Sequence, residues 1–163
     1  MISRKVLITG SFAVGKTSLF HRFVYNTFSD QYLTTIGVKV DKRVVSLNGE
    51  EVALILWDIA GEVSQQKVPR TYFLGASAVI YVFDLSREQT ANNLKKDLRL
   101  IKKILPGCLI KVVGNKKDLV SEEQQLILQR AHQPDCLTSA KTGENVEDLF
   151  LSIARELSER GIG

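Results

Sequence analysis

Cysteine, aromatic residues and long apolar runs are all scarce in this chain, which has 2 cysteines among 163 residues. Cys108 and Cys136 form no Cys-x-x-Cys pair or Cys/His cluster and lie in apolar segments, so we expect two small, reduced core residues. The most apolar stretch, Ala76 to Phe83, is too short to cross a bilayer, and no leader pattern precedes the first apolar run. We therefore expect a cytoplasmic protein without direct membrane insertion.

A block of basic residues is also missing. The chain has 22 Lys and Arg against 18 Asp and Glu, a net charge of +4 that is spread along the sequence. Few aromatic residues are interleaved with the basic ones, so nucleic-acid binding is not expected. With no repeat, linker or low-complexity segment, residues 1–163 are predicted to form one domain, and we expect a monomer.

The apolar residues that are present follow two periods. Strand-length runs at Ile2–Thr9, Val79–Asp84 and Leu109–Gly114 alternate with amphipathic helical patterns, which predicts a mostly parallel sheet with helices on both faces. One predicted helix ends at Pro106-Gly107 and repeats its apolar residues at i, i+4, i+7 and i+11: Leu94, Leu98, Ile101 and Leu105. The last predicted helix buries one stripe: Val146, Leu149, Phe150, Ile153, Ala154 and Leu157.

One pair of strands departs from the parallel pattern. Val38–Leu47 and Glu51–Trp57 are joined at Asn48-Gly49, which is the strongest short signal for a hairpin. We therefore expect a three-layer α/β fold whose six-stranded sheet contains a single antiparallel hairpin strand.

The most informative motif is Gly10–Thr17, which fits G-x-x-x-x-G-K-[ST] between an apolar strand and the helical segment Ser18–Val24. This is the context of a phosphate-binding loop: backbone N–H groups curl around a phosphate, Lys16 reaches the outer phosphates and the Thr17 hydroxyl can coordinate Mg²⁺. The alternative is a glycine-punctuated turn with a solvated lysine.

Further polar residues follow the predicted strands, where ligands of open α/β sheets bind. Asp58 follows Leu54–Trp57 and can hold a Mg²⁺-bound water, or it can cap a helix. In Asn115-Lys116-Lys117-Asp118, the Asp118 carboxylate can accept the paired N–H donors of guanine; the alternative is a solvated turn. Thr138-Ser139-Ala140-Lys141 can offer backbone N–H groups to the guanine carbonyl.

Together, in this order, these motifs resemble the Ras superfamily of small GTPases over essentially the whole chain. Two segments, Thr34-Thr35-Ile36-Gly37-Val38 and Trp57 through Ala76, look most like the Rab branch. The resemblance implies a P-loop NTPase fold and a switch that binds GTP or GDP with Mg²⁺ and hydrolyses GTP slowly. It implies these nucleotide-binding residues: Ala13, Val14, Gly15, Lys16, Thr17, Ser18, Phe28, Tyr32, Thr35, Gly61, Asn115, Lys116, Asp118, Ser139, Ala140 and Lys141.

The resemblance also assigns roles. Thr17, Thr35 and Asp58 would hold Mg²⁺, while Lys16, Thr35 and Glu62 would form the catalytic set. Phe28 would lie edge-on to the guanine, although packing at a helix end is a competing role. Effectors, exchange factors and GTPase-activating proteins would bind residues about 30–40 and 60–74. The apolar residues near that surface can equally be buried in the fold: Ile36, Val38, Val40 and Trp57.

Three features depart from the family pattern. Glu62 stands where a glutamine usually orients the attacking water, so hydrolysis is expected to be impaired unless the carboxylate acts as a general base. Phe12 stands where a small residue is usual, and it either blocks an inserted arginine or packs against the region of Val63. The ending Glu159–Gly163 has no cysteine for prenylation, so membrane association would need a missing tail or a partner.

The alternatives to a slow GTPase are a GTP-dependent scaffold with negligible hydrolysis and a P-loop nucleotide kinase. A kinase would need an arginine-bearing lid, and Asn115 to Asp118 would then have no role.

Overall fold

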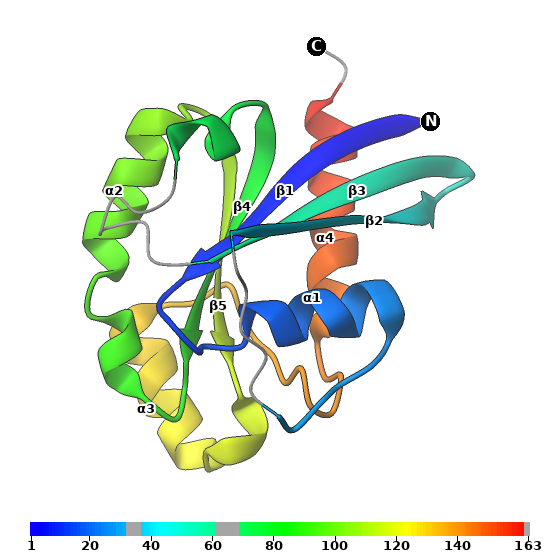
Figure 1. Ribbon diagram of the computed structural model, residues 1–163. Helices are drawn as coiled ribbons and strands as arrows, with labels where there is room; N and C mark the ends of the chain where they lie inside the picture. Colours follow the sequence, from blue (N-terminus) through cyan, green and yellow to red (C-terminus); the bar gives the residue numbers. More distant parts are fainter. Residues whose placement is uncertain (32–36, 61–68, 162–163) are drawn as a thin grey trace.

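The structure is a computed structural model that describes residues 1–31, 37–60 and 69–161. Its centre is a six-stranded sheet in the order β2-β3-β1-β4-β5-β6 (Figure 1). The strands are β1 (Ile2–Gly10), β2 (Val38–Leu47), β3 (Glu50–Ile59), β4 (Ala76–Asp84), β5 (Leu109–Asn115) and β6 (Cys136–Leu137).

Helices cover both faces of this sheet, α1 and α4 on one side and α2 and α3 on the other (Figure 1). They are α1 (Lys16–Tyr25), α2 (Leu94–Ile104), α3 (Glu122–His132) and α4 (Val146–Arg160). Short 3₁₀ turns lie at η2 (Arg70–Phe73), η3 (Glu88–Ala91) and η4 (Lys117–Leu119). The predicted three-layer α/β architecture is confirmed.

The predicted hairpin is also confirmed. β2 pairs antiparallel with β3, whereas the pairs β1–β3, β1–β4, β4–β5 and β5–β6 are all parallel. Asn48 and Gly49 have φ angles of 50° and 84°. Two successive positive φ angles give the turn whose twist matches the flanking strands, which explains why Asn-Gly occupies it.

The apolar stripe predicted for the last helix is buried at all six positions. On this face of the sheet Phe150 of α4 stacks on Phe23 of α1, with ring centroids 4.0 Å apart. The helix predicted from Leu94 to Leu105 is one residue shorter, because α2 ends at Ile104. Leu105 precedes Pro106, and the residue before a proline is disfavoured in helical backbone.

Both cysteines are free thiols. Burial raises the pKa of Cys108 and of Cys136 to about 11, so neither is a thiolate near neutral pH. None of the helices in the described residues is long and apolar enough to span a membrane.

Candidate nucleotide-binding site

The loop Gly10–Thr17, called the P-loop below, packs so closely that two of its glycines cannot be replaced. At Gly10, whose φ is +145°, an added Cβ would lie 2.1 Å from the carbonyl oxygen of Val82. At Gly15, whose φ is +100°, it would lie 2.2 Å from Nδ2 of Asn115. The glycines therefore bring the loop against β4 and against the residue that ends β5.

Lys16 follows this loop at the start of α1 and folds back over it. Its Nζ donates to the carbonyl oxygens of Gly10 at 2.8 Å and Ser11 at 3.2 Å, and the residue is 8% exposed. This excludes the alternative of a solvated lysine. The ammonium group is held at the mouth of the loop, where a phosphate would meet it.

Thr17 and Asp58 meet although they are 41 residues apart: the Thr17 hydroxyl donates to Oδ2 of Asp58 at 2.6 Å. Asp58 is 0% exposed and lies inside β3, so it does not cap a helix. A hydroxyl and a carboxylate oxygen side by side are the hard oxygen ligands that Mg²⁺ prefers, so the pair fits the ion.

Asn115 ties three segments together at the end of β5. Its Nδ2 donates to the carbonyl oxygen of Val14 at 3.1 Å, and its Oδ1 accepts from the Thr138 hydroxyl at 3.0 Å and the Ala140 N–H at 3.3 Å. The amide thus bridges two loops, because one planar group satisfies the P-loop on one side and residues 138–140 on the other.

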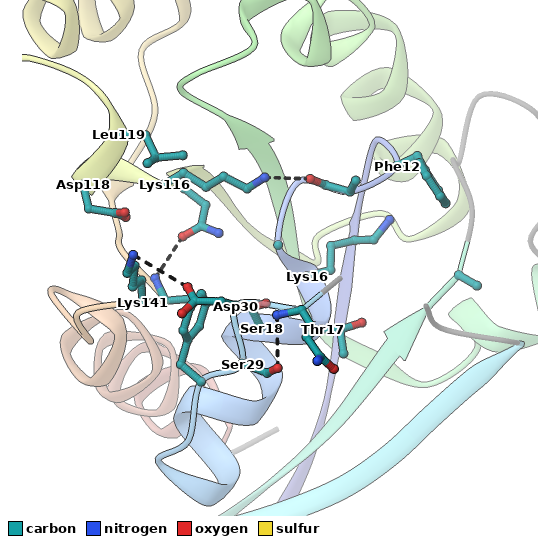
Figure 2. Close-up of a pocket in the computed structure, with 17 residues that line it drawn as sticks. Phe12, Lys16, Thr17, Ser18, Ser29, Asp30, Lys116, Asp118, Leu119 and Lys141 are labelled. Atoms are coloured by element: carbon teal, nitrogen blue, oxygen red, sulfur yellow. Dashed lines mark hydrogen bonds and ion pairs between the residues drawn. The ribbon is translucent and has the colours of Figure 1, made fainter. Parts of the chain in front are cut away.

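Asp118 is exposed beside this bridge, in the middle of η4. Its Oδ1 accepts from the Ser139 hydroxyl at 2.7 Å. Across the opening, Lys141 Nζ lies 3.6 Å from Oδ1 of Asp30 (Figure 2). The Ser139 hydroxyl therefore fixes the orientation of the Asp118 carboxylate, while the edge of that carboxylate stays open toward a ligand.

These groups enclose a cavity of about 340 Å³, shown in Figure 2. That volume falls within the range of small-molecule sites. Eleven of the predicted residues line it: Ala13, Gly15, Lys16, Thr17, Ser18, Phe28, Asn115, Lys116, Asp118, Ala140 and Lys141. Phe28 also packs against the core beneath, which is compatible with both of its proposed roles.

Some predicted residues are not at the cavity wall. Val14 is completely buried behind the P-loop, and Ser139 is buried behind Asp118. Tyr32, Thr35, Ile36, Gly61 and Glu62 lie outside the described residues. Phe12 is 60% exposed at the rim, and Val63, its suggested packing partner, also lies outside the described residues.

A group of residues that includes Asp84 and Arg87, which belong to no sequence motif, holds the P-loop from behind. Arg87 Nη2 donates to the carbonyl oxygens of Phe12 at 3.1 Å and Ala13 at 2.7 Å, while its Nε contacts Asp84 Oδ2 at 2.9 Å. Lys116 Nζ contacts the same Asp84 oxygen at 2.9 Å and the Ala13 carbonyl at 3.0 Å. Two cations thus join the P-loop to one buried carboxylate.

This arrangement stabilises the ionised form of Asp84. Its burial alone would raise the pKa, but hydrogen bonds from Ser86, Lys116 and Arg87 outweigh that effect and hold the pKa below its usual value. The signal was present in the sequence, because Asp84 is the last residue of a predicted strand, where functional residues were expected. Arg87 carried no comparable signal, and neither did Ser29, Asp30, Gln31, Ala60 and Leu119, which also line the cavity.

Comparison with known proteins identifies the family to which this chain belongs. The model of the Ras family matches residues 5–159. The chain belongs to the Ras family. Among its relatives, the Ras-related protein Rab-4B of Homo sapiens is 37% identical over 160 residues, covering 94% of this chain and 75% of the relative. The GTP-binding protein ypt1 of Schizosaccharomyces pombe is 35% identical over 163 residues, covering 96% and 80%.

A plant relative, the Ras-related protein RABE1e of Arabidopsis thaliana, is 33% identical over 164 residues, covering 96% of this chain and 75% of the relative. Relatives of the Rab type from animals, a plant and a yeast confirm the predicted likeness to the Rab branch. This Ras-family chain has a six-stranded sheet with one antiparallel pair and a glycine-rich loop between β1 and α1.

Proposed function

We propose that this chain is a guanine-nucleotide switch that binds GTP or GDP with Mg²⁺ and hydrolyses GTP slowly. The observation that carries the proposal is one cavity lined by the P-loop, Thr17 and Asp118, with Asp58 hydrogen-bonded to Thr17 beside it. Membership of the Ras family supports it, as does the likeness to the yeast relative, which is named a GTP-binding protein.

Each part of the cavity has a task in this proposal. The P-loop N–H groups and Lys16 neutralise the phosphates, and Asp118 accepts the two adjacent N–H groups that distinguish guanine from adenine. Ser139 fixes that carboxylate, while Lys116 packs its stem along the base. Thr17 and Asp58, with Thr35, would hold Mg²⁺, which would supply positive charge to offset the charge that develops during phosphoryl transfer to water.

Hydrolysis is where this chain differs from its family. A glutamine after Gly61 would donate an amide hydrogen bond to the attacking water, and Glu62 has no such donor when ionised. We propose slow phosphoryl transfer with Lys16 and Thr35 stabilising the transition state and Glu62 contributing little. The competing function is a GTP-dependent scaffold with negligible turnover, and Glu62 is the observation that favours it.

As a Ras-family protein, the chain is proposed to act as a monomeric, single-domain switch within residues 1–163. Its partners would be effectors, exchange factors and GTPase-activating proteins that bind residues about 30–40 and 60–74. Val40 is 46% exposed on β2 and is available to such partners, whereas Val38 and Trp57 are partly buried against the core. Nucleic acid is not among the proposed partners.

Hydrogen exchange tests the switch. Amides in residues 30–38 and 60–72 should exchange more slowly with a non-hydrolysable GTP analogue and Mg²⁺ than with GDP, because the terminal phosphate would order both segments. The sheet should change little. Thr35→Ala should remove the difference. Equal exchange in both states, or a difference that survives in the variant, would contradict a conventional switch.

The contacts of Arg87 predict a second result. Arg87→Ala removes donors to the Phe12 and Ala13 carbonyls, so GDP should dissociate roughly 10-fold faster. Arg87→Lys should recover little, since Arg87 contacts Asp84 through Nε and the two carbonyls through Nη2, and a lysine has one nitrogen in place of these two. Arg155→Ala, at an exposed arginine of α4, is the matched control. An unchanged GDP dissociation rate in Arg87→Ala would show that the P-loop does not depend on this contact.

A further inference from the structure

The outer side of α2 is the most uniformly charged helix surface in the described part of the chain. Five exposed cations lie on it, called the α2 basic face below: Lys95, Lys96, Arg99, Lys102 and Lys103. The ion pairs found among the described residues include none of the five. Their charges are therefore directed to solvent and are not cancelled by an ion pair with any other described residue.

Acidic residues are also nearly absent from the sequence around α2. Between Gln89 and Lys117 the only acidic residue is Asp97. It is 3% exposed and accepts a hydrogen bond of 2.5 Å from the Tyr81 hydroxyl, beneath the helix. Before that segment, Glu88 lies 3.1 Å from His132 Nε2 of α3. The positive potential of the α2 basic face is not offset by a carboxylate on its own helix surface.

The five cations share one side of the helix. At 100° per residue they span an arc of about 120°, and from Lys95 to Lys103 they extend about 12 Å along the axis. The opposite side packs on the sheet, with Leu94 and Ile101 buried in the core. The exposed hydrophobic residues of the described chain include none from α2. The face therefore offers charge alone, without an apolar side chain to insert.

We propose that the α2 basic face binds the surface of a bilayer that contains anionic phospholipid. Four of the five cations are lysines, whose compact and strongly hydrated charges suit a diffuse anionic surface better than bidentate recognition of a single group. A protein partner is a poorer fit, because the centre of a protein interface is depleted of lysine and needs apolar contact. Clusters of this size on an amphipathic helix are typical of binding to anionic lipid.

Lipid binding at α2 would not interfere with the proposed nucleotide binding, because α2 does not contribute to the cavity. The residues that line the nucleotide cavity come from the P-loop, α1 and the loops after α1, β3, β5 and β6, and none comes from α2. α2 lies at one side of the molecule, on the sheet face opposite α1 and α4 (Figure 1). Lipid contact would thus hold the protein by a face that is independent of nucleotide binding, and it requires neither a prenyl group nor a partner.

Vesicle co-sedimentation of the full chain tests the proposal. The protein should bind vesicles of 70% phosphatidylcholine and 30% phosphatidylserine but not pure phosphatidylcholine, and binding should be lost as NaCl rises from about 0.05 to 0.5 M. Each cation near such a surface changes partitioning about 5-fold, so Lys95→Gln/Arg99→Gln/Lys102→Gln should lower it roughly 100-fold. Lys95→Arg/Lys102→Arg should bind as the wild type does, because charge is what the surface requires.

The matched control is Lys42→Gln/Arg130→Gln/Arg155→Gln, which removes the same charge from exposed residues outside α2. It should retain most of the binding. GDP dissociation rates should be unchanged in all variants, so a failure here is distinguishable from a failure of the nucleotide proposal. The proposal is overturned if the vesicles are not bound, if the control falls as far as the α2 variant, or if only poly-glutamate in solution is bound.

Discussion

Asp118→Asn should weaken GTP binding on the order of 10²–10³-fold, because guanine would lose two charge-assisted hydrogen bonds and meet an amide instead. The same variant should bind xanthosine triphosphate better than the wild type does, since the changed edge of xanthine suits an amide. Competition binding with the four common triphosphates and the xanthine nucleotide measures both effects.

Asp30→Asn is the control for that variant. Asp30 also lines the cavity, but its side chain is 82% exposed and faces Lys141, so its carboxylate is not assigned to the base. GTP affinity should change little. If Asp118→Asn left the order of nucleotide preference unaltered, Asp118 would not be the residue that selects the base.

If Glu62 faces the terminal phosphate as proposed, Glu62→Gln should raise single-turnover GTP hydrolysis by up to about 10²-fold, because it would restore an oriented amide donor and remove a negative charge. Phe12→Gly should add to the gain if the ring occupies space that water needs. Phosphate release from protein loaded with GTP is the measurement, and Glu51→Gln, at an exposed carboxylate of β3, is the control. The two gains are not expected to add fully, since both residues are proposed to act on one phosphate.

The opposite outcome has a defined meaning. If Glu62 is a working general base, Glu62→Gln should slow phosphate release, and the wild-type rate should fall as acid protonates the carboxylate. A brisk wild-type rate that neither Glu62→Gln nor Phe12→Gly alters would show that another residue positions the water. Each of these results would identify the chain as a GTPase, because a scaffold that merely holds GTP would release negligible phosphate.

The sheet could be predicted from the sequence because its signals are local. Apolar runs that alternate with helical patterns predict the parallel strands. Asn48-Gly49 predicts the hairpin, because both residues adopt the positive φ angles that its turn requires. The residues at which helices and strands end could be predicted less well. α2 ends at Ile104 rather than at Leu105, because Leu105 precedes a proline.

The candidate site was predictable where a motif fixes both residue type and spacing. Lys16, Thr17 and Asn115 line one cavity, and Asp58 bonds Thr17 beside it, because each follows or lies at the carboxyl end of a neighbouring strand. The support from Arg87 was not predictable, since it depends on the path of the chain after β4 and on bonds to backbone oxygens that have no sequence signature. A site residue without a motif becomes visible only once the fold has placed it.

The nucleotide that the purified protein retains tests the central claim most directly. Heat denaturation in the presence of Mg²⁺, followed by chromatography and mass measurement of the released small molecules, identifies both the base and the number of phosphates. The proposed function predicts GDP or GTP, close to one molecule per chain. Release of an adenine nucleotide, or an empty protein that binds ATP as tightly as GTP, would contradict it.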